Sequence, residues 1–216
     1  MIRDVNKLAR VDFCSEMLAA NVGFSDCVFT DECTVQIDCS TKFCFVKKGD
    51  QYSRMRNRAK HPAKVHIWGG ISVRGATRLA ILPGNCRIDS ELYCRIIERC
   101  YIPFKSKVYN GFCRLVQDNA PPHKSRYTSD KFKNWGVDTL AWPAESPDLN
   151  PIELIWGNMK KMIRKQGIGN LDALKVAIAQ YWDTLTPEIC SRYVAGIRKR
   201  MERVVEQEGR NITEDR

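Results

Sequence analysis

The sequence of 216 residues contains no apolar run approaching the ~20 residues needed to cross a membrane. Its first residues, MIRDVNKLAR, mix charged and apolar side chains and lack the apolar core of a secretory signal. These absences favour an intracellular protein with no membrane partner. With 44% hydrophobic residues, the chain has enough apolar material for one large domain with a buried core.

Paired CxxC cysteines are absent, and the only histidines are His61, His66 and His123. A zinc site built from cysteine and histidine therefore lacks suitable ligands. Several cysteines stand in apolar runs, such as Cys44 in FCFV, so we expect free, buried thiols in a reducing compartment. The ten cysteines are Cys14, Cys27, Cys33, Cys39, Cys44, Cys86, Cys94, Cys100, Cys113 and Cys190.

Acidic residues are missing from the whole of residues 51–87, in a chain whose 35 Lys and Arg outnumber its 25 Asp and Glu. A clustered positive charge favours a polyanion such as DNA as partner, because phosphate contacts release counterions. A solvated basic loop is the alternative interpretation. The DNA-binding candidates in this segment are Arg54, Arg56, Arg58, Lys60 and Lys64.

The order of periodic segments predicts a mixed α/β domain. A helix is expected over residues 1–20, with an apolar stripe that includes Val5, Leu8 and Val11. Strand-like runs are expected at 27–31, 34–37, 43–47, 65–73, 77–82, 114–117 and 137–140. Further helices are expected at about 89–101, 123–135, 151–166, 171–184 and 187–207.

Three carboxylates stand where expected elements end. Asp31 closes the run CVFTD, Asp118 closes RLVQD, and Glu153 opens a helix. Strand ends and helix starts are typical positions for ligand chemistry in α/β proteins. Each carboxylate also has a purely structural interpretation: the two aspartates would end strands in Asx turns, and Glu153 would complete a capping box with Asn150.

Four segments around these carboxylates resemble the Tc-one/mariner superfamily of transposases. They are FTDE at 29–32, HIWGGIS at 66–72, VQDNAPPHKSR at 116–126 and WPAESPDLNPIELIW at 142–156. They occur in the order of that family, and 34 residues separate Asp118 from Glu153, as in its Tc-one branch. The resemblance covers about residues 5–165. It implies an RNase H-like mixed sheet, with three antiparallel strands followed by parallel strands, flanked by helices and extended by extra C-terminal helices.

The same resemblance implies a division of the chain into an N-terminal helix (1–20), a catalytic core (21–170) and a C-terminal helical extension (171–216). It implies that Asp31, Asp118 and Glu153 are the catalytic residues and the ligands of two Mg²⁺ or Mn²⁺ ions, with Asp31 bridging both. Mg²⁺ prefers oxygen ligands, and two ions can clamp the attacking and leaving oxygens of a phosphodiester. The expected function is cleavage of double-stranded DNA at transposon ends followed by strand transfer, with no small-molecule cofactor.

The helix that begins near Glu153 carries a basic face. Lys160, Lys161 and Arg164 stand seven, eight and eleven residues after Glu153, on the side of the carboxylate. We expect contacts with a phosphate backbone there, and an ordinary solvated face is the equal alternative. For His123, a structural role is as good an interpretation as one in positioning phosphate or water.

Family members usually begin with tandem helix-turn-helix units, whereas about thirty residues precede Asp31 here. We therefore do not expect this chain alone to recognise specific transposon ends. A homodimer is expected by analogy, because two ends must be handled together, and a nuclear location follows if the source is eukaryotic. The alternatives are a catalytically silent DNA-binding remnant of a transposase, and another RNase H-like enzyme such as a ribonuclease or an integrase.

Overall fold

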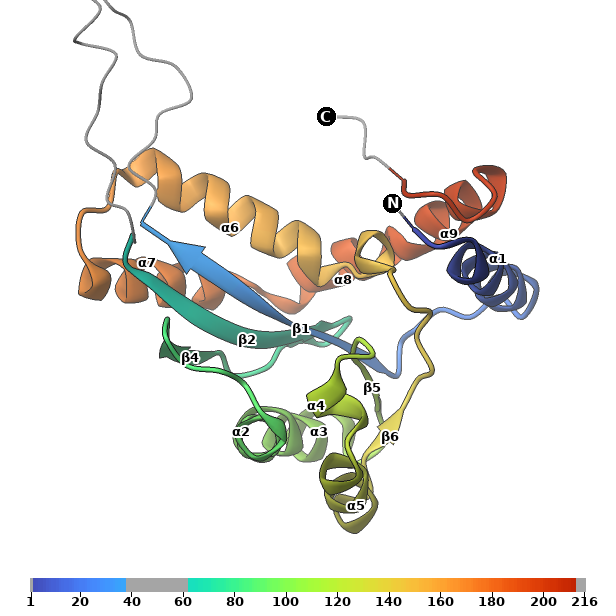
Figure 1. Cartoon of the computed structure of the whole chain (residues 1–216), viewed down its shortest axis with the longest axis horizontal. Helices are drawn as coiled ribbons and strands as arrows, with labels where there is room; N and C mark the ends of the chain where they lie inside the picture. Colours follow the sequence, from blue (N-terminus) through green and yellow to red (C-terminus); the bar gives the residue numbers. More distant parts are fainter. Residues whose placement is uncertain (1, 38–61, 213–216) are drawn as a thin grey trace, which may run out of the picture.

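A mixed sheet of six strands forms the centre of the computed structural model, which describes residues 2–37 and 62–212 (Figure 1). The central strand β1 (Cys27–Gln36) runs antiparallel to β2 (Lys64–Ser72) and parallel to β5 (Arg114–Val116). The outer strands are β3 (Gly75–Ala76) and β4 (Ala80–Pro83), both antiparallel to β2, and β6 (Asp138–Thr139), parallel to β5. Antiparallel strands on one side and parallel strands on the other confirm the predicted type of sheet.

The first strand corrects the sequence interpretation. Residues 27–31 and 34–37, expected as two strands, form the single strand β1. The polar residues at the centre of β1 continue the antiparallel pairing with β2: Asp31 pairs with Gly69, and Glu32 pairs with Trp68. The strand expected at 43–47 lies outside the described residues.

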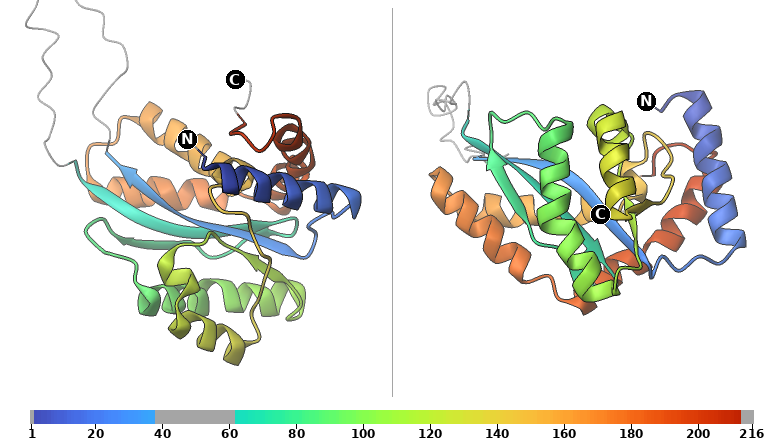
Figure 2. Two further views of the ribbon diagram at one scale, coloured as in Figure 1. Left: turned by 45° about the vertical axis from the view of Figure 1, so that its right-hand side comes forward. Right: turned by 90° about the horizontal axis from the view of Figure 1, so that it is seen from below.

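Helices cover both faces of the sheet (Figures 1 and 2). One face carries α2 (Ser90–Ile96), the π-helical turn η2 (Ile97–Tyr101), α3 (Ile102–Tyr109), α4 (Pro121–Lys124) and α5 (Arg126–Trp135). The other carries α1 (Asp4–Ala19), α6 (Ile152–Gln166), α7 (Leu171–Asp183), α8 (Pro187–Ala195) and α9 (Ile197–Glu206). In the described part of the chain, none of these helices is long and apolar enough to cross a membrane.

Two expected helices are interrupted. The helix expected at 123–135 breaks at Ser125, whose extended backbone (ψ 152°) ends α4 and whose side chain accepts a hydrogen bond from Thr128 N–H to cap α5. The helix expected at 187–207 is divided at Gly196 into α8 and α9. By contrast, the helix capped by Asp89 begins as predicted and continues through η2 into α3.

The alternation of side chains along β1 creates two cores. Val28 is buried with Tyr93 and Leu115 on the α2 face, whereas Phe29 is buried with Trp142 and Trp156 on the α6 face. Successive residues of a strand point to opposite faces, so one buried strand serves both layers. Each such large apolar side chain contributes about 1.5–3 kcal/mol when fully buried.

The first and last helices lie side by side, since α1 packs against α9 (Figure 2). The expected apolar stripe of α1 is wrong in its first half: Val5 and Leu8 are each 68% exposed, and the helix instead buries Arg10 and Cys14. At its end Met17 and Leu18, also expected in the stripe, pack against the core. The division at residues 20 and 170 stays a prediction.

The cysteines follow the prediction of free thiols. Among the described residues no cysteine forms a disulfide, and all but Cys86 are buried. Cys39 and Cys44 lie outside the described residues.

Two glycines in β2 allow close packing against the sheet. A Cβ on Gly69 would lie 2.5 Å from Trp182, and a Cβ on Gly70 would lie 2.8 Å from Thr30. Trp182 has little freedom to move, because its indole N–H donates a hydrogen bond of 2.8 Å to the carbonyl oxygen of Thr77. The glycine pair of HIWGGIS therefore has a packing role.

We predict that Gly69→Ala lowers the free energy of unfolding by about 1–3 kcal/mol, because the added methyl overpacks a rigid site. Gly157→Ala is the matched control, since its Cβ would meet nothing within 4 Å. Alanine is favoured over glycine in a helix by up to about 1 kcal/mol, so the control should be neutral or stabilising. Urea unfolding followed by circular dichroism measures both, and equal stability of Gly69→Ala and wild type would contradict the packing role.

Candidate active site

The site lies where β1 extends beyond its parallel neighbour. β5 pairs with β1 only over Cys27–Phe29, so the next residues of β1 have no strand partner on that side among residues 2–37 and 62–212. Just beyond the last paired residue, Thr30 bonds back to β5: its hydroxyl donates a hydrogen bond of 2.8 Å to the carbonyl oxygen of Val116. Asp31 therefore stands inside β1 rather than at its end, while Asp118 follows β5 by two residues.

The third carboxylate is brought in by the start of α6. Asn150 donates its side-chain amide to the carbonyl oxygen of Thr30 (3.2 Å) and accepts from Ile152 N–H (3.3 Å). It thus fastens the residue before Asp31 to the residue before Glu153. The capping-box interpretation of Glu153 is wrong, because the Asn150 N–H donates to the carbonyl oxygen of Pro147 instead.

Asp31, Asp118 and Glu153 line one pocket of about 420 Å³, together with Trp142, Glu145 and the loop that leads to Asn150. Burial, followed by the charge of Glu153, raises the pKa of Asp31 to about 8. Two carboxylates so placed disfavour each other's charged forms. Their hard oxygen donors suit Mg²⁺ or Mn²⁺, whose charge would remove that penalty.

Asp118 has a different environment from Asp31. Its Oδ1 lies 2.7 Å from Nδ1 of His123 and accepts from Ala120 N–H at 2.9 Å, so the Asx turn expected at Asp118 is present. The imidazole of His123 beside it lowers the pKa of Asp118. Across residues 2–37 and 62–212, no three His, Cys, Asp or Glu side chains are grouped closely enough to hold a metal ion. The donor chemistry fits a metal, but the carboxylate of Asp118 contacts His123.

His123 is the buried link between two acidic residues. Its Nε2 lies 3.3 Å from Oε1 of Glu32, while its Nδ1 contact with Asp118 is short but not aligned as a hydrogen bond. Burial would lower the pKa of His123, but the carboxylates of Asp118 and Glu32 outweigh it and raise the pKa to about 9. The imidazole ring also packs on Tyr93, at 4.0 Å between centroids. Tyr93 donates its hydroxyl to Gln117, next to Asp118.

A buried ion pair anchors the loop before α6. The guanidinium of Arg10, which is fully buried, lies 2.7 Å from both carboxylate oxygens of Asp148. It also donates to the carbonyl oxygens of Glu145 and Gly209, and Asp148 accepts from Ile212 N–H. Sequence reasoning missed this pair: Asp148 belongs to the SPDLNP segment, but Arg10 is 138 residues away.

Some of the predicted DNA-binding residues lie near one another at the end of β1. Lys160 and Arg164 line a pocket of about 300 Å³ together with Gln36, and Lys64 pairs with Gln36 in the sheet. Lys64 and Lys161 are exposed. Arg54, Arg56, Arg58 and Lys60 lie outside the described residues.

Trp142 and Trp156, the two tryptophans near the site, pack in the core. The ring of Trp142 meets those of Phe13 and Phe29 edge-on, and Trp156 stacks on Trp182 at 5.3 Å. Neither ring is free to stack on a DNA base.

The fold is that of the catalytic domain of the Mos1 mariner transposase. A crystal structure of that domain superimposes with a TM-score of 0.79 at 17% identity, covering 99% of this chain and 98% of that one. The Mos1 mariner paired end complex with Mn gives a TM-score of 0.86 at 17% identity, with 65% of its chain covered. These likenesses confirm the RNase H-like fold class.

Sequence relatives point in the same direction. The Tc3 transposase of Caenorhabditis elegans is 27% identical over 213 residues, which is 96% of this chain and 63% of the relative. The Tc1 transposase of the same organism is 27% identical over 162 residues, which is 73% of this chain and 59% of the relative. The chain thus spans less than two thirds of the curated relatives that it matches. The predicted resemblance to Tc1/mariner transposases is confirmed.

Fold and relatives together define an RNase H-like domain similar to those of transposases. The family described as DDE superfamily endonuclease matches residues 26–175, well over half of the sequence. The chain belongs to this family.

We predict that Arg10→Ala lowers the free energy of unfolding by about 3–5 kcal/mol, because it leaves the Asp148 carboxylate buried without its partner. Arg3→Ala is the matched control: Arg3 pairs with Glu145 at 3.0 Å, but its side chain is 70% exposed. The control should cost no more than about 1 kcal/mol. Urea unfolding measures both, and similar losses in the two variants would contradict the anchoring role.

Proposed function

We propose that this chain is the catalytic part of a DNA transposase, a metal-dependent endonuclease that cuts double-stranded DNA at transposon ends and joins them to target DNA. Asp31, Asp118 and Glu153 are the proposed catalytic residues and the ligands of two Mg²⁺ or Mn²⁺ ions. Membership of an endonuclease family supports the cleavage step. The likeness to Mos1, which has been crystallised as a strand transfer complex, supports the joining step.

The observation that carries the proposal is the pair of carboxylates on β1 and α6. Asp31 is largely buried beside Glu153, and its pKa is raised by that burial and by the neighbouring charge. Such crowding has a cost in stability, and strained electrostatics of this kind are concentrated at functional sites. A site that served only the fold would place a cation or an amide against Asp31.

The chemistry is an in-line displacement at phosphorus. In cleavage the oxygen of water attacks phosphorus and loses a proton. The bond from phosphorus to the 3′-oxygen breaks, and the departing oxygen takes up a proton, which leaves a 3′-hydroxyl and a 5′-phosphate. In joining, that 3′-hydroxyl loses a proton and attacks a phosphodiester of the target DNA, whose own 3′-oxygen leaves and takes up a proton. Bound divalent ions would stabilise the negative charge that develops on the phosphoryl oxygens.

The protein residues supply position and charge. Asp31 is fixed by the β-ladder, and Glu153 by the Asn150 link to Thr30. His123 holds Asp118 as a carboxylate, because the contact between them lowers the pKa of Asp118. Completion of the three-carboxylate site requires Asp118 to turn from His123 toward Asp31 and Glu153.

A catalytically silent DNA-binding remnant is the less favoured function. All three carboxylates are present, and residues 26–175 match a family of endonucleases. Nicking of DNA that depends on a divalent metal distinguishes the two functions.

We predict that the wild-type chain nicks supercoiled plasmid in the presence of Mn²⁺. Asp118→Ala, Asp31→Asn and Glu153→Gln should each lower the rate at least about a hundredfold, since each removes charge needed at the transition state. Asp172→Asn is the control, because Asp172 is 91% exposed on α7. Gel electrophoresis of the plasmid measures the rate, and undiminished nicking by Asp118→Ala would refute its assignment.

We also predict opposite effects of Asp31→Asn on stability with and without metal. Without metal, at neutral pH, the variant should be more stable than wild type by about 1–2 kcal/mol. Folding forces wild-type Asp31, whose pKa is raised to about 8, to take up a proton or to bury a charge beside Glu153, and asparagine does neither. With Mg²⁺ or Mn²⁺ only the wild type should gain stability, through binding to the folded state. Thermal unfolding at several metal concentrations measures both effects. An equal gain for the two proteins would place metal binding elsewhere.

A further inference from the structure

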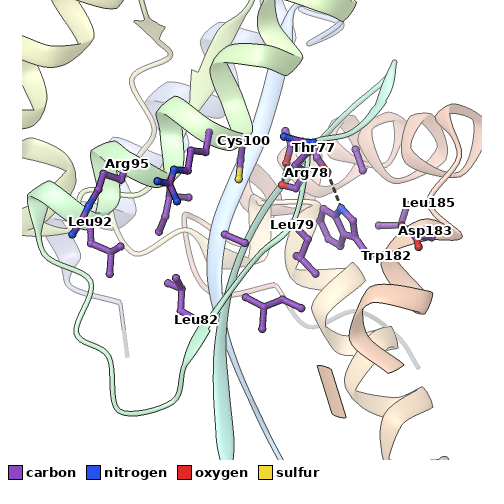
Figure 3. Close-up of a pocket in the computed structure, with 15 residues that line it drawn as sticks. Thr77, Arg78, Leu79, Leu82, Leu92, Arg95, Cys100, Trp182, Asp183 and Leu185 are labelled. Carbon is purple, nitrogen blue, oxygen red and sulfur yellow. Dashed lines mark hydrogen bonds between the residues drawn. The ribbon is translucent and has the colours of Figure 1, made fainter. Parts of the chain in front are cut away.

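A second cavity, remote from the carboxylates, lies along the free edge of the sheet. It has a volume of about 810 Å³ and is lined by residues 76–82, by α2 and η2, and by the end of α7 (Figure 3). We name it the edge groove. Strands β3 and β4 pair with β2 on one side, and no described strand pairs with them on the other. The groove is therefore bordered by a sheet edge between two helical layers.

The walls of the edge groove are mainly apolar. Leu79 and Leu82 from the strand segment and Leu92 from α2 are half-buried around the cavity (Figure 3). On the opposite wall Trp182 and Leu185 are buried. Leu82 and Leu92 pack with the core on the α2 face, whereas Leu79 packs with the core on the α6 face. The groove thus opens where the two cores meet at the sheet edge.

Positive charge surrounds this apolar groove. Arg78, Arg95 and Arg99 line it and are exposed, and none of them forms an ion pair with a carboxylate of the described residues. Arg99 comes from the π-helical turn η2, a rare conformation that is frequent at functional sites. Asp183 is the one acidic residue among those that line the groove. The rim therefore favours an anionic ligand.

The edge also offers unused backbone hydrogen-bond donors. Between β3 and β4, Thr77 N–H donates to Gly70, and the Thr77 carbonyl oxygen accepts from Trp182. The next two amides, of Arg78 and Leu79, donate to no acceptor within the described part of the chain. Free amides at a sheet edge are the groups to which an added strand binds.

We propose that the edge groove binds an extended, acidic peptide segment of a partner protein by strand addition. The peptide main chain pairs with the segment that contains Arg78 and Leu79, its alternate apolar side chains enter the groove, and its acidic side chains meet the three arginines. Side chains of a strand alternate in direction, so one peptide can satisfy both the apolar wall and the charged rim. The proposal concerns a surface other than the carboxylate site and does not depend on the proposed nuclease activity.

A peptide suits the edge groove better than a nucleic acid does. DNA contacts are dominated by phosphate, which arginines and free amides can also bind, but duplex DNA has no apolar side chain to fill a cavity lined by leucines. A main chain supplies the matching acceptors and donors, and apolar residues fill the cavity. The arginines would attract either ligand, so the experiment below compares the peptide with a DNA duplex.

The experiment measures fluorescence polarisation of a labelled peptide of alternating valine and glutamate, about eight residues long, with the full chain. We expect saturable binding with a Kd below about 1 mM. The variant Arg78→Glu/Arg95→Glu/Arg99→Glu should bind at least about tenfold more weakly, because the rim charge is reversed. The same variant should gain affinity for a valine–lysine peptide. Circular dichroism checks that it remains folded.

Three controls make the result decisive. The variant Arg126→Glu/Lys133→Glu/Lys199→Glu reverses the same number of exposed charges on α5 and α9 and should bind the peptide like wild type. N-methylation of alternate peptide amides should weaken binding at least about tenfold, because it removes main-chain donors but no side chain. Unaltered binding of the N-methylated peptide would overturn strand addition. Two outcomes would overturn the peptide proposal. One is that the unmodified peptide does not bind. The other is that a short DNA duplex displaces the peptide and that binding of the duplex also requires the three arginines.

Discussion

The ion pair between Arg10 and Asp148 connects parts of the chain that no local interaction could hold together. It joins α1 to the loop before α6 and, through the carbonyl oxygen of Gly209 and the amide of Ile212, to the end of the described chain. Burying two charges is expensive, and the cost is offset only when every hydrogen bond is satisfied. Here the guanidinium has four acceptor groups: Asp148 and the carbonyl oxygens of Glu145, Gly209 and Arg210. The loop it holds leads directly to Asn150, whose side chain reaches β1, so the position of Glu153 relative to Asp31 depends on a contact outside the site.

The three carboxylates of the pocket, Asp31, Asp118 and Glu153, have different electrostatic environments. Asp31 is buried beside Glu153, and its pKa is raised, whereas Asp118 is exposed and has a pKa lowered by His123. Asp31 and Glu153 therefore disfavour each other's charged forms, whereas Asp118 has a cationic partner in His123. Glu32 shares that partner, since His123 lies between it and Asp118. A cation in the pocket would displace the proton that Asp31 otherwise holds, and it would compete with His123 for Asp118.

The sequence predicted the order of strands and helices because burial is periodic in most of them. It also predicted three carboxylates at one site, although the reason given for Asp31 was wrong. The local run CVFTD ends in polar residues, which suggested that the strand ends at Asp31. Pairing with β2 instead extends β1 to Gln36. Asp31 faces the pocket because β5, the parallel neighbour of β1, stops pairing at Phe29. Long-range pairing of this kind has no local signal. The same holds for α1, where Val5 and Leu8 are exposed and Arg10 is buried, because the acceptors for its guanidinium come from residues 145–210. The sequence predicted only part of the role of Asn150. Its place before a helix indicated a cap, whereas its hydrogen bond to the carbonyl oxygen of Thr30 depends on the tertiary fold.

A continuous series of contacts relates the edge groove to the carboxylate site. Trp182 lines the groove, donates to Thr77 at the sheet edge, and packs so closely on Gly69 that no Cβ fits between them. Gly69 is the residue of β2 that pairs with Asp31. Closely packed interiors transmit small displacements rather than absorbing them. The indole of Trp182 thus touches both the wall of one cavity and the strand residue opposite a carboxylate of the other, and this double contact accounts for the requirement for glycine at position 69.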